Sequence, residues 1–530
     1  MILSKNLSAP IDLDRLVNDF IKTGKTERLL LLVPTNRKLR NLKKEIISLS
    51  PRETASDINL ETLTTISSRL LGELNRFHEL SEAASTILIK QSALEIKTKY
   101  FKAYRDEIPF GTLDRIKNVI SEYKKHGITP EILIAEAEKL DSAEKLKALD
   151  IAAIYESYNA KCRNLNALEI GDIYNLLDEI EDSRIENLFR KIYPEVELTA
   201  LLGFDELTKP EAELINKISE IENLDLYINF DYFGYNKYIF SHLEKTYESL
   251  ENKGFKKIND ISPNTHNEFQ NSVREKLFRI NEEKISKFSD NLFRLAAGNR
   301  EEEIILIAKE IKKLLQSPEV QPHQICVAFN LIDKYSPIIR DVFRSYGIPF
   351  NLTDRISLNN SFPVIELMNF LEILENDFYH KNIFRALSGG FIKIKDVDLY
   401  NLKKIAAQLK IVAGREHWIN SVRKASANLK YEEDISQAAI MFRKRQFEKA
   451  ETDINKIYEA LKVFDKKLTM KDFVRELKNL ALKLNLHKNL LLNADGSEEE
   501  NIKAVSSFFE TIEEIFELLQ LEEEKEKKYD

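Results

Sequence analysis

The feature that most constrains this 530-residue sequence is a long segment, 78–181, whose pattern is almost purely helical. Short apolar runs flank it on both sides, each with the length and composition of a buried parallel strand. These runs are 29–33, 58–64, 196–204 and 224–230. Two groups of strands separated by a helical block predict one α/β domain that carries a helical insertion.

A second α/β pattern begins near Asn291. Strand-like segments at 292–297, 325–329 and 348–353 alternate with helical segments, one of which should end at Gly347. After about Phe362 the pattern is helical, and the tail 521–530 reads as a charged helix with no closing strand. We therefore expect a chain that is incomplete as a fold. The predicted divisions are 1–77 and 182–285 for the first α/β domain, 78–181 for its insertion, 286–361 for the start of a second α/β domain, and 362–530 for a further helical insertion.

Composition limits the function. The net charge is −8, so any contact with nucleic acid must come from a local basic patch. Two distant cysteines, Cys162 and Cys326, and eight scattered histidines provide no spacing for a metal site or a disulfide framework. Asp12 and Asp14 lie where a signal peptide needs apolar residues, and no apolar run is long enough to cross a bilayer. We expect a soluble, cytoplasmic chain that holds no metal or cofactor and has no membrane partner.

The tripeptide Gly24-Lys25-Thr26 matches the end of a phosphate-binding loop. Such a loop also needs a glycine five residues upstream, a strand before it and a helix after it. Here the upstream residue is Asp19, a helix is predicted before the tripeptide, and a strand is predicted after it. We therefore interpret Gly24 as the cap of a helix and Lys25 as a solvated side chain.

The strand-to-helix turn that follows is more informative. Thr35 and Asn36 come directly after the apolar run, and either can cap the next helix. Basic residues then follow along that helix: Arg37, Lys38, Arg40, Lys43 and Lys44. A helix start with hydroxyl and amide donors can bind a phosphate without reading a base. The simpler interpretation is a solvated basic face.

Five ordered segments resemble superfamily-one helicases. The first is LLLLVPTNRKLRNLKKEI, like the strand and T-N-K-A-A turn of their second motif. The next three are Thr62–Leu71 (with Thr64 in place of a usual His), ALEIGDIYNLL (167–177) and LLGFDELTKPEAELINKI. The fifth is ICVAFNLIDKYSPIIRDVFRSYGIPFNL, in which Asn330 replaces a usual Arg. The pattern GF-x-x-LT-x-x-E-x-x-L is similar to that of AddB-type subunits of bacterial helicase–nuclease complexes, and the resemblance covers 28 to about 375.

This resemblance implies RecA-like parallel-sheet domains and a helicase-like subunit that binds DNA, without hydrolysing ATP, in double-strand break repair by homologous recombination. It implies single-stranded DNA and an AddA-type motor subunit as partners. The residues that would bind DNA are Thr35, Asn36, Arg37, Lys38, Arg40, Lys44, Thr62, Thr64 and Thr65. Lys25, Asp205 and Glu206 would mark a vestigial nucleotide site, and no residue is expected to be catalytic. Stacking aromatic residues cannot be selected from a composition that is 9% aromatic.

AddB-type subunits also end in a PD-(D/E)XK nuclease domain with four cysteines around an iron–sulfur cluster. The sequence contains neither that core nor those cysteines. Two alternatives stay open. One is an active ATP-driven helicase, in which Asp205 and Glu206 hold magnesium. The other is a helical scaffold that only presents a protein-binding surface.

Overall fold

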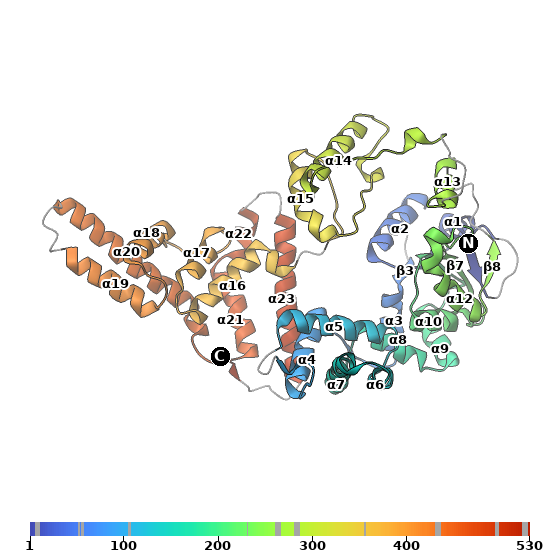
Figure 1. Cartoon of the computed structure of the whole chain (residues 1–530), viewed down its shortest axis with the longest axis horizontal. Coiled ribbons are helices and arrows are strands. Elements are labelled where there is room, and N and C mark those ends of the chain that lie inside the picture. Colours follow the sequence, from blue (N-terminus) through green and yellow to red (C-terminus); the bar gives the residue numbers. More distant parts are fainter. Residues whose placement is uncertain are drawn as a thin grey trace. The chain divides into compact units, whose positions relative to one another are not determined.

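The computed structural model describes the whole chain except 6–10, 51–53, 55–57, 104–107, 231, 260–266, 280–286, 355–356, 430–435, 493–497, 522–527 and 530. The chain divides into two compact units, Met1–Leu292 and Phe293–Asp530, and Figure 1 shows the elements of both. The five-part division expected from the sequence is finer than this and stays a prediction.

A six-stranded mixed sheet organises the first unit. Its strand order is β3-β2-β6-β7-β1-β8. The four strands from β3 to β7 pair in parallel, and β1 pairs antiparallel with both of its neighbours. The bounds are β1 (Ile2–Ser4), β2 (Leu29–Val33), β3 (Asn59–Thr62), β6 (Leu198–Phe204), β7 (Asp225–Phe230) and β8 (Lys256–Asn259). The α/β class is confirmed, and all four strands expected in this unit are present within a few residues of their predicted bounds.

Helices cover both faces of this sheet (Figure 1). Strand β2 is wholly buried, and successive side chains point to opposite faces. Leu29 and Leu31 pack under α1 (Leu13–Lys22) and α2 (Asn36–Leu49). Leu30 and Leu32 join the larger core on the other face. The helices over that larger core are α3 (Leu63–Gly72), α8 (Ile170–Asp178), α9 (Asp182–Ile192), α10 (Lys209–Ser219) and α12 (Glu244–Asn252).

Where the structure describes it, the predicted block 78–181 is helical apart from two very short strands, one at 78–79 and one at 167–168, and α8 follows the second strand and packs on the sheet. Its helices are α4 (Glu82–Glu95), α5 (Phe110–Lys125), α6 (Pro130–Ala137) and α7 (Ser142–Asn164). Strand β4 (His78–Glu79) pairs in parallel with β5 (Ala167–Leu168). The backbone amide of His78 donates to the carbonyl of Asn166 at 2.9 Å. The insertion therefore begins and ends at one place.

A buried lysine joins three helices of this region. The ammonium of Lys124 on α5 lies 2.7 Å from Asp172 and 3.4 Å from Glu169, and it faces the ring of Tyr158 at 4.5 Å. Only 1% of the Lys124 side chain is exposed. A Cβ at Gly171 would clash with the backbone of Lys124, so glycine allows α8 to approach α5 closely. The segment ALEIGDIYNLL thus has a clear packing role.

The second unit begins with two packed helices, α14 (Arg300–Leu314) and α15 (Ile332–Ser345). Gly347 follows α15 with a φ of +60°, as expected for a helix stop. The strands predicted at 292–297, 325–329 and 348–353 are wrong, because none of these described segments pairs in a sheet. Apolar runs form strands only where a neighbouring strand accepts and donates their backbone hydrogen bonds.

From Phe362 onward the second unit is helical, as predicted. Trp418 is fully buried in its core and donates its indole N–H to the carbonyl of Phe378 at 3.0 Å. The helices are α16 (Phe362–Glu375), α17 (His380–Ser388), α18 (Leu399–Leu409), α19 (Arg415–Asn428), α20 (Gln437–Leu461), α21 (Met470–Lys483), α22 (Leu486–Leu492) and α23 (Glu498–Leu521). Lys528–Tyr529 (β10) pairs with Leu468–Thr469 (β9) in a separate two-stranded sheet, so the charged helix expected at these two residues is wrong. The rest of the predicted tail helix, 522–527 and 530, lies outside the described residues.

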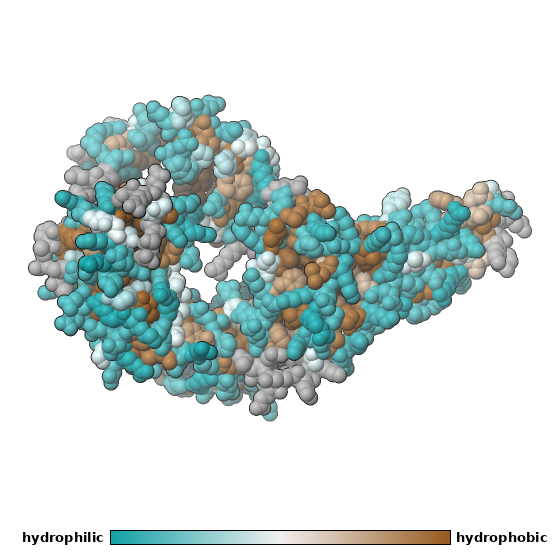
Figure 2. Space-filling model, turned by 180° about the vertical axis from the view of Figure 1, so that it is seen from behind, coloured by the Kyte–Doolittle hydropathy of each residue, from teal (hydrophilic) through white to brown (hydrophobic). Residues whose placement is uncertain are grey.

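Hydrophilic residues cover most of the face shown in Figure 2, and a hydrophobic patch lies over α22, where Leu491 and Leu492 are exposed. Among the described residues, no helix combines the length and the apolar character that a bilayer span requires.

Candidate nucleic-acid interface

The carboxyl ends of four parallel strands lie along one edge of the sheet. In open α/β sheets this edge is the usual place for ligands. Thr62 at the end of β3 is in register with Val33 at the end of β2. Thr35 and Asn36 follow β2, and Asp205 and Glu206 follow β6, the next strand along. The structure therefore brings the predicted threonine segments together with the acidic pair at one edge.

Thr35 is the N-cap of α2, one of the two residues that the sequence offered for this role. The Thr35 hydroxyl oxygen accepts a hydrogen bond from the backbone N–H of Lys38 at 3.2 Å, and its own O–H can still donate. The backbone N–H groups of Asn36 and Arg37 lie in the first turn, where a helix offers them no acceptor. This first turn contains no acidic residue. An anion at this position would meet amide donors and the positive end of the helix dipole.

The outer face of α2 is basic. Thr35 and Asn36 are exposed, and so are the five cations that follow. None of these five, Arg37, Lys38, Arg40, Lys43 and Lys44, forms a salt bridge with a carboxylate of a described residue, and the helix contains one acidic residue, Glu45. Ile46 is the only fully buried side chain of the helix. Helix α2 therefore packs on the sheet through a narrow apolar face, and its basic side chains are exposed to solvent.

The second threonine segment is less open than the first. Thr62 is only 6% exposed, and it caps α3 by accepting from the backbone N–H of Thr65 at 3.2 Å. The hydroxyl oxygens of Thr62 and Thr65 also lie 2.9 Å apart. Thr64 and Thr65 are exposed. The structure therefore offers Thr64 and Thr65 to a ligand, whereas Thr62 is turned into the fold.

The acidic pair is exposed and does not cap the next helix. Asp205 accepts the backbone N–H of Glu206 at 3.0 Å. Thr208 caps α10 instead and forms a reciprocal capping box with Glu211. Neither Asp205 nor Glu206 therefore caps α10.

Lys25 lies away from the acidic pair. It precedes the amino end of β2, whereas Asp205 follows the carboxyl end of the parallel neighbour β6. Gly24 has a φ of +73°, and the backbone amides of Gly24 and Lys25 donate to the carbonyls of Ile21 and Phe20. These bonds define a Schellman cap, so the interpretation of Gly24 as a helix cap is confirmed. The structure does not bring the three residues of the vestigial nucleotide site together.

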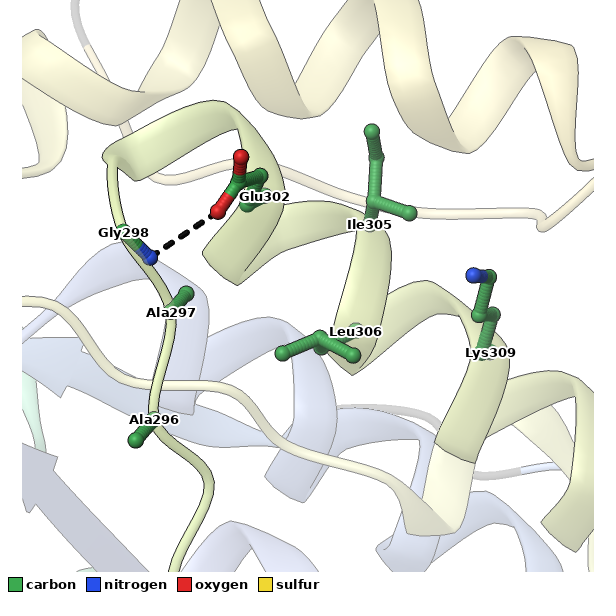
Figure 3. Close-up of a pocket in the computed structure, with 7 residues that line it drawn as sticks. All are labelled: Ala296, Ala297, Gly298, Glu302, Ile305, Leu306 and Lys309. Carbon is green, nitrogen blue, oxygen red and sulfur yellow. Dashed lines mark hydrogen bonds between the residues drawn. The ribbon is translucent and has the colours of Figure 1, made fainter.

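Other parts of the described structure offer few residues for metal binding or catalysis. In the part of the chain that the structure describes, no group of three His, Cys, Asp or Glu side chains could hold a metal ion. A cavity of about 430 Å³ lies in the second unit, lined by the segment from Ala296 to Gly298 and by α14 (Figure 3). Its carboxylate, Glu302, accepts the backbone N–H of Gly298 at 2.9 Å, and Lys309 is its one cation.

Comparison with known families assigns the chain. The model of the family described as "ADDB, N-terminal" matches residues 13–280, which is just over half of the sequence and includes the whole edge described above. The chain belongs to the AddB family.

Relatives within this family are named as B-type subunits of an ATP-dependent helicase/deoxyribonuclease. One from Thermoanaerobacter sp. (strain X514) is 24% identical over 485 residues, which cover 87% of this chain and 40% of the relative. One from Clostridioides difficile (strain 630) is 23% identical over 453 residues, covering 79% of this chain and 36% of the relative. This AddB-family chain thus spans at most about 40% of the length of these relatives.

No aromatic residue of this AddB-family chain was predicted from the sequence to bind DNA. The structure places the run YFGYNKYIF (232–240) directly after β7, at the same edge of the sheet. Five of its nine residues are aromatic. That local enrichment is a signal that could have been recognised without coordinates.

Proposed function

We propose that this chain is the helicase-like, DNA-binding part of a helicase–nuclease complex that acts in double-strand break repair by homologous recombination. In this proposal it holds a single DNA strand and does not hydrolyse ATP. The observation that carries the proposal is the exposed start of α2, where hydroxyl and amide donors lie beside five cations with no carboxylate partner among the described residues.

The Met1–Leu292 unit would then be a RecA-like motor domain that has lost its nucleotide loop. The parallel order β3-β2-β6-β7 with helices on both faces supports this assignment. The sequence between β1 and α1, residues 5–12, contains no glycine, and Lys25 belongs to a helix cap. Both features support an inactive nucleotide site, because phosphate-binding loops need glycines for close backbone approach.

Phosphates of the strand would lie along the edge of the sheet. Thr35, the first amides of α2, Thr64 and Thr65 would hold them, and the cations of α2 would add attraction that is independent of sequence. The exposed carboxylates of Asp205 and Glu206 lie at the same edge and would repel phosphate, so the phosphates should be held at the start of α2 and not at the end of β6. An AddA-type subunit is the proposed motor partner, and the cytoplasm is the proposed compartment.

The test is fluorescence anisotropy with a labelled single-stranded oligonucleotide over a range of salt concentrations. Each lost phosphate contact should reduce the slope of log K against log salt by about 0.7. Arg40→Glu with Lys44→Glu should therefore weaken binding and flatten the slope by about 1.4 or more. Thr35→Ala should weaken binding further.

The matched control is Lys97→Glu with Lys147→Glu, two exposed lysines of the helical insertion. This variant has the same change in net charge and should bind like the wild type. Equal losses from both double variants, or binding insensitive to salt, would refute the proposed interface. DNA-stimulated ATP hydrolysis by the chain alone would instead favour an active helicase.

A further inference from the structure

The run after β7 separates buried rings from exposed ones. Tyr232 and Phe233 are only 8% and 6% exposed, and Tyr232 stacks on Tyr247 with ring centroids 5.0 Å apart. Tyr235 and Tyr238 are 46% and 66% exposed. The inner rings therefore anchor the segment, and the two outer rings lie at the surface.

A second segment, at the end of α13 (Glu268–Lys276), is fixed against the first. The Asn236 side chain is fully buried and donates to the carbonyls of Arg274 at 3.0 Å and Leu277 at 3.1 Å. The Arg279 guanidinium donates to the carbonyl of Tyr235. These bonds hold the two segments together on both sides of position 278.

Phe278 occupies an unusual backbone conformation. Its φ is +65°, and its side chain is 69% exposed. Left-handed geometry is costly for a residue with a Cβ, and it persists only where surrounding contacts impose it. The hydrogen bonds to Leu277 and from Arg279 supply that constraint. The fold thus holds the Phe278 ring exposed to water, although the backbone conformation of this residue is unfavourable.

Exposed aromatic rings are concentrated here. In the described part of Met1–Leu292, five aromatic side chains belong to the exposed class, and three of them are Tyr235, Tyr238 and Phe278. The other two, Tyr100 and Phe110, lie in the helical insertion. We call the three the aromatic cluster.

The two segments that carry the cluster are basic. Residues 232–240 and 274–279 contain Lys237, Arg274, Lys276 and Arg279, against one carboxylate, Glu275. Lys237 also lies 3.3 Å from Glu244 of α12. The net excess of cations suits a polyanion.

The cluster lies at the same edge of the sheet as the start of α2. Strand β7 is separated from β2 by β6 alone, and neighbouring strands lie about 4.8 Å apart, so the ends of β7 and β2 are about 10 Å apart. The cluster begins five residues beyond the end of β7, so a single strand held by its phosphates at α2 would cross the end of β6 before its bases reach the cluster.

We propose that Tyr235, Tyr238 and Phe278 form a base-stacking platform for single-stranded nucleic acid. This inference rests on the proposed function. Phosphate contacts alone do not distinguish a single strand from a duplex, whereas stacking gives a preference for unpaired bases. Stacking uses the face of a base, which a duplex hides, and it tolerates any sequence because every base has such a face. The alternative occupant of these rings is a protein partner.

Three labelled probes of equal length test the proposal by anisotropy with the full chain: oligo(dT), a strand with abasic sugars in place of its bases, and a duplex. The wild type should bind oligo(dT) more tightly than either of the others. Tyr238→Ala and Phe278→Ala should each weaken oligo(dT) binding by roughly 5- to 150-fold and leave abasic binding unchanged. Tyr238→Phe should retain binding.

Two further variants separate recognition from folding. Phe110→Ala removes an equally exposed ring, 70% exposed, in the helical insertion and should change nothing. Phe278→Gly relieves the left-handed strain, so it should weaken oligo(dT) binding without lowering the melting temperature.

The outcomes distinguish this inference from the proposed function. Salt-dependent binding of oligo(dT) and the abasic strand with equal affinity would overturn the stacking platform and keep the phosphate site. If both alanine variants bind oligo(dT) as the wild type does, the stacking platform is overturned, the phosphate site is kept, and a protein partner becomes the expected occupant of the rings. Absence of binding to both single-stranded probes would overturn both.

Discussion

The ammonium group of Lys38 lies over the backbone of Gly203. A Cβ at position 203 would clash with Nζ of Lys38, and Gly203 has a φ of +78° at an irregularity of β6 between Leu202 and Phe204. A cation of α2 thus reaches across the edge of the sheet to the strand that precedes the acidic pair. Glycine makes this approach possible.

Gly203→Ala should be destabilising. A non-glycine residue in the left-handed region costs about 1–2 kcal/mol, and the new methyl group would displace the flexible end of Lys38. We expect the free energy of unfolding in urea to fall by about that amount. Binding of single-stranded DNA should weaken as well if Lys38 contacts phosphate.

The control is Gly72→Ala. Gly72 is the last residue of α3, and a Cβ there would meet no atom within 4 Å. Alanine is a better helix former than glycine by up to about 1 kcal/mol, so this variant should be neutral or more stable. Equal effects at both positions would contradict the steric account.

Removal of the buried cation should be costly. Lys124→Met keeps the length of the side chain but leaves Asp172 and Glu169 without their cation. Loss of one partner of a buried ion pair typically costs about 3–5 kcal/mol. Lys125→Met removes a neighbouring, 41% exposed lysine that pairs with Glu122, and it should cost less than about 1 kcal/mol. Chemical denaturation of the two variants makes the comparison, and similar stabilities would contradict it.

The same lysine predicts a loss of stability in alkali. Burial by itself lowers the pKa of Lys124, but attraction to Asp172 and Glu169 outweighs burial and raises that pKa above the ordinary 10.5. Its contribution is therefore complete below pH 10.5 and is lost as the pH rises through the folded-state pKa. The free energy of unfolding of the wild type should fall more steeply above pH 10.5 than that of Lys124→Met. Parallel curves would show that the lysine is not responsible.

The two cysteines should differ in reactivity. Cys162 is 3% exposed, and burial raises the pKa of its thiol to about 12, whereas Cys326 is exposed. The thiolate is the reactive form, so a maleimide at neutral pH should modify Cys326 and spare Cys162 until the chain unfolds. Mass spectrometry of the native and denatured chain counts the labels. Two labels on the native chain would mean that the helical insertion opens readily.

Local pattern was sufficient where local chemistry decides the structure. The buried run Leu29–Val33 and the helix cap that follows it depend on side chains within a few residues. The run was predicted correctly, and the cap was narrowed to Thr35 or Asn36. The three-residue strand β1 was missed, because its place between β7 and β8 depends on partners more than 200 residues away. The strands expected in 292–353 had suitable side chains but no backbone partners.

Exposure explains why the aromatic cluster was not predicted. Tyr232 and Tyr235 are three residues apart and chemically identical, yet one packs on Tyr247 and the other lies at the surface. Only the packing of α12 and α13 against the run after β7 separates them. The basic helix needed no such information, because five cations along fourteen residues exceed what a buried face can hold.

The pairing of β4 with β5 makes neighbours of two chain positions that are nearly ninety residues apart in sequence. A segment whose two ends already meet can be lengthened, shortened or exchanged at little cost to the strands on either side, since loop closure depends only weakly on length. The helical insertion is in this respect a cassette. Evolution, or an engineer, can replace it while the sheet keeps its architecture, provided that the replacement supplies a cation to Glu169 and Asp172 in place of Lys124.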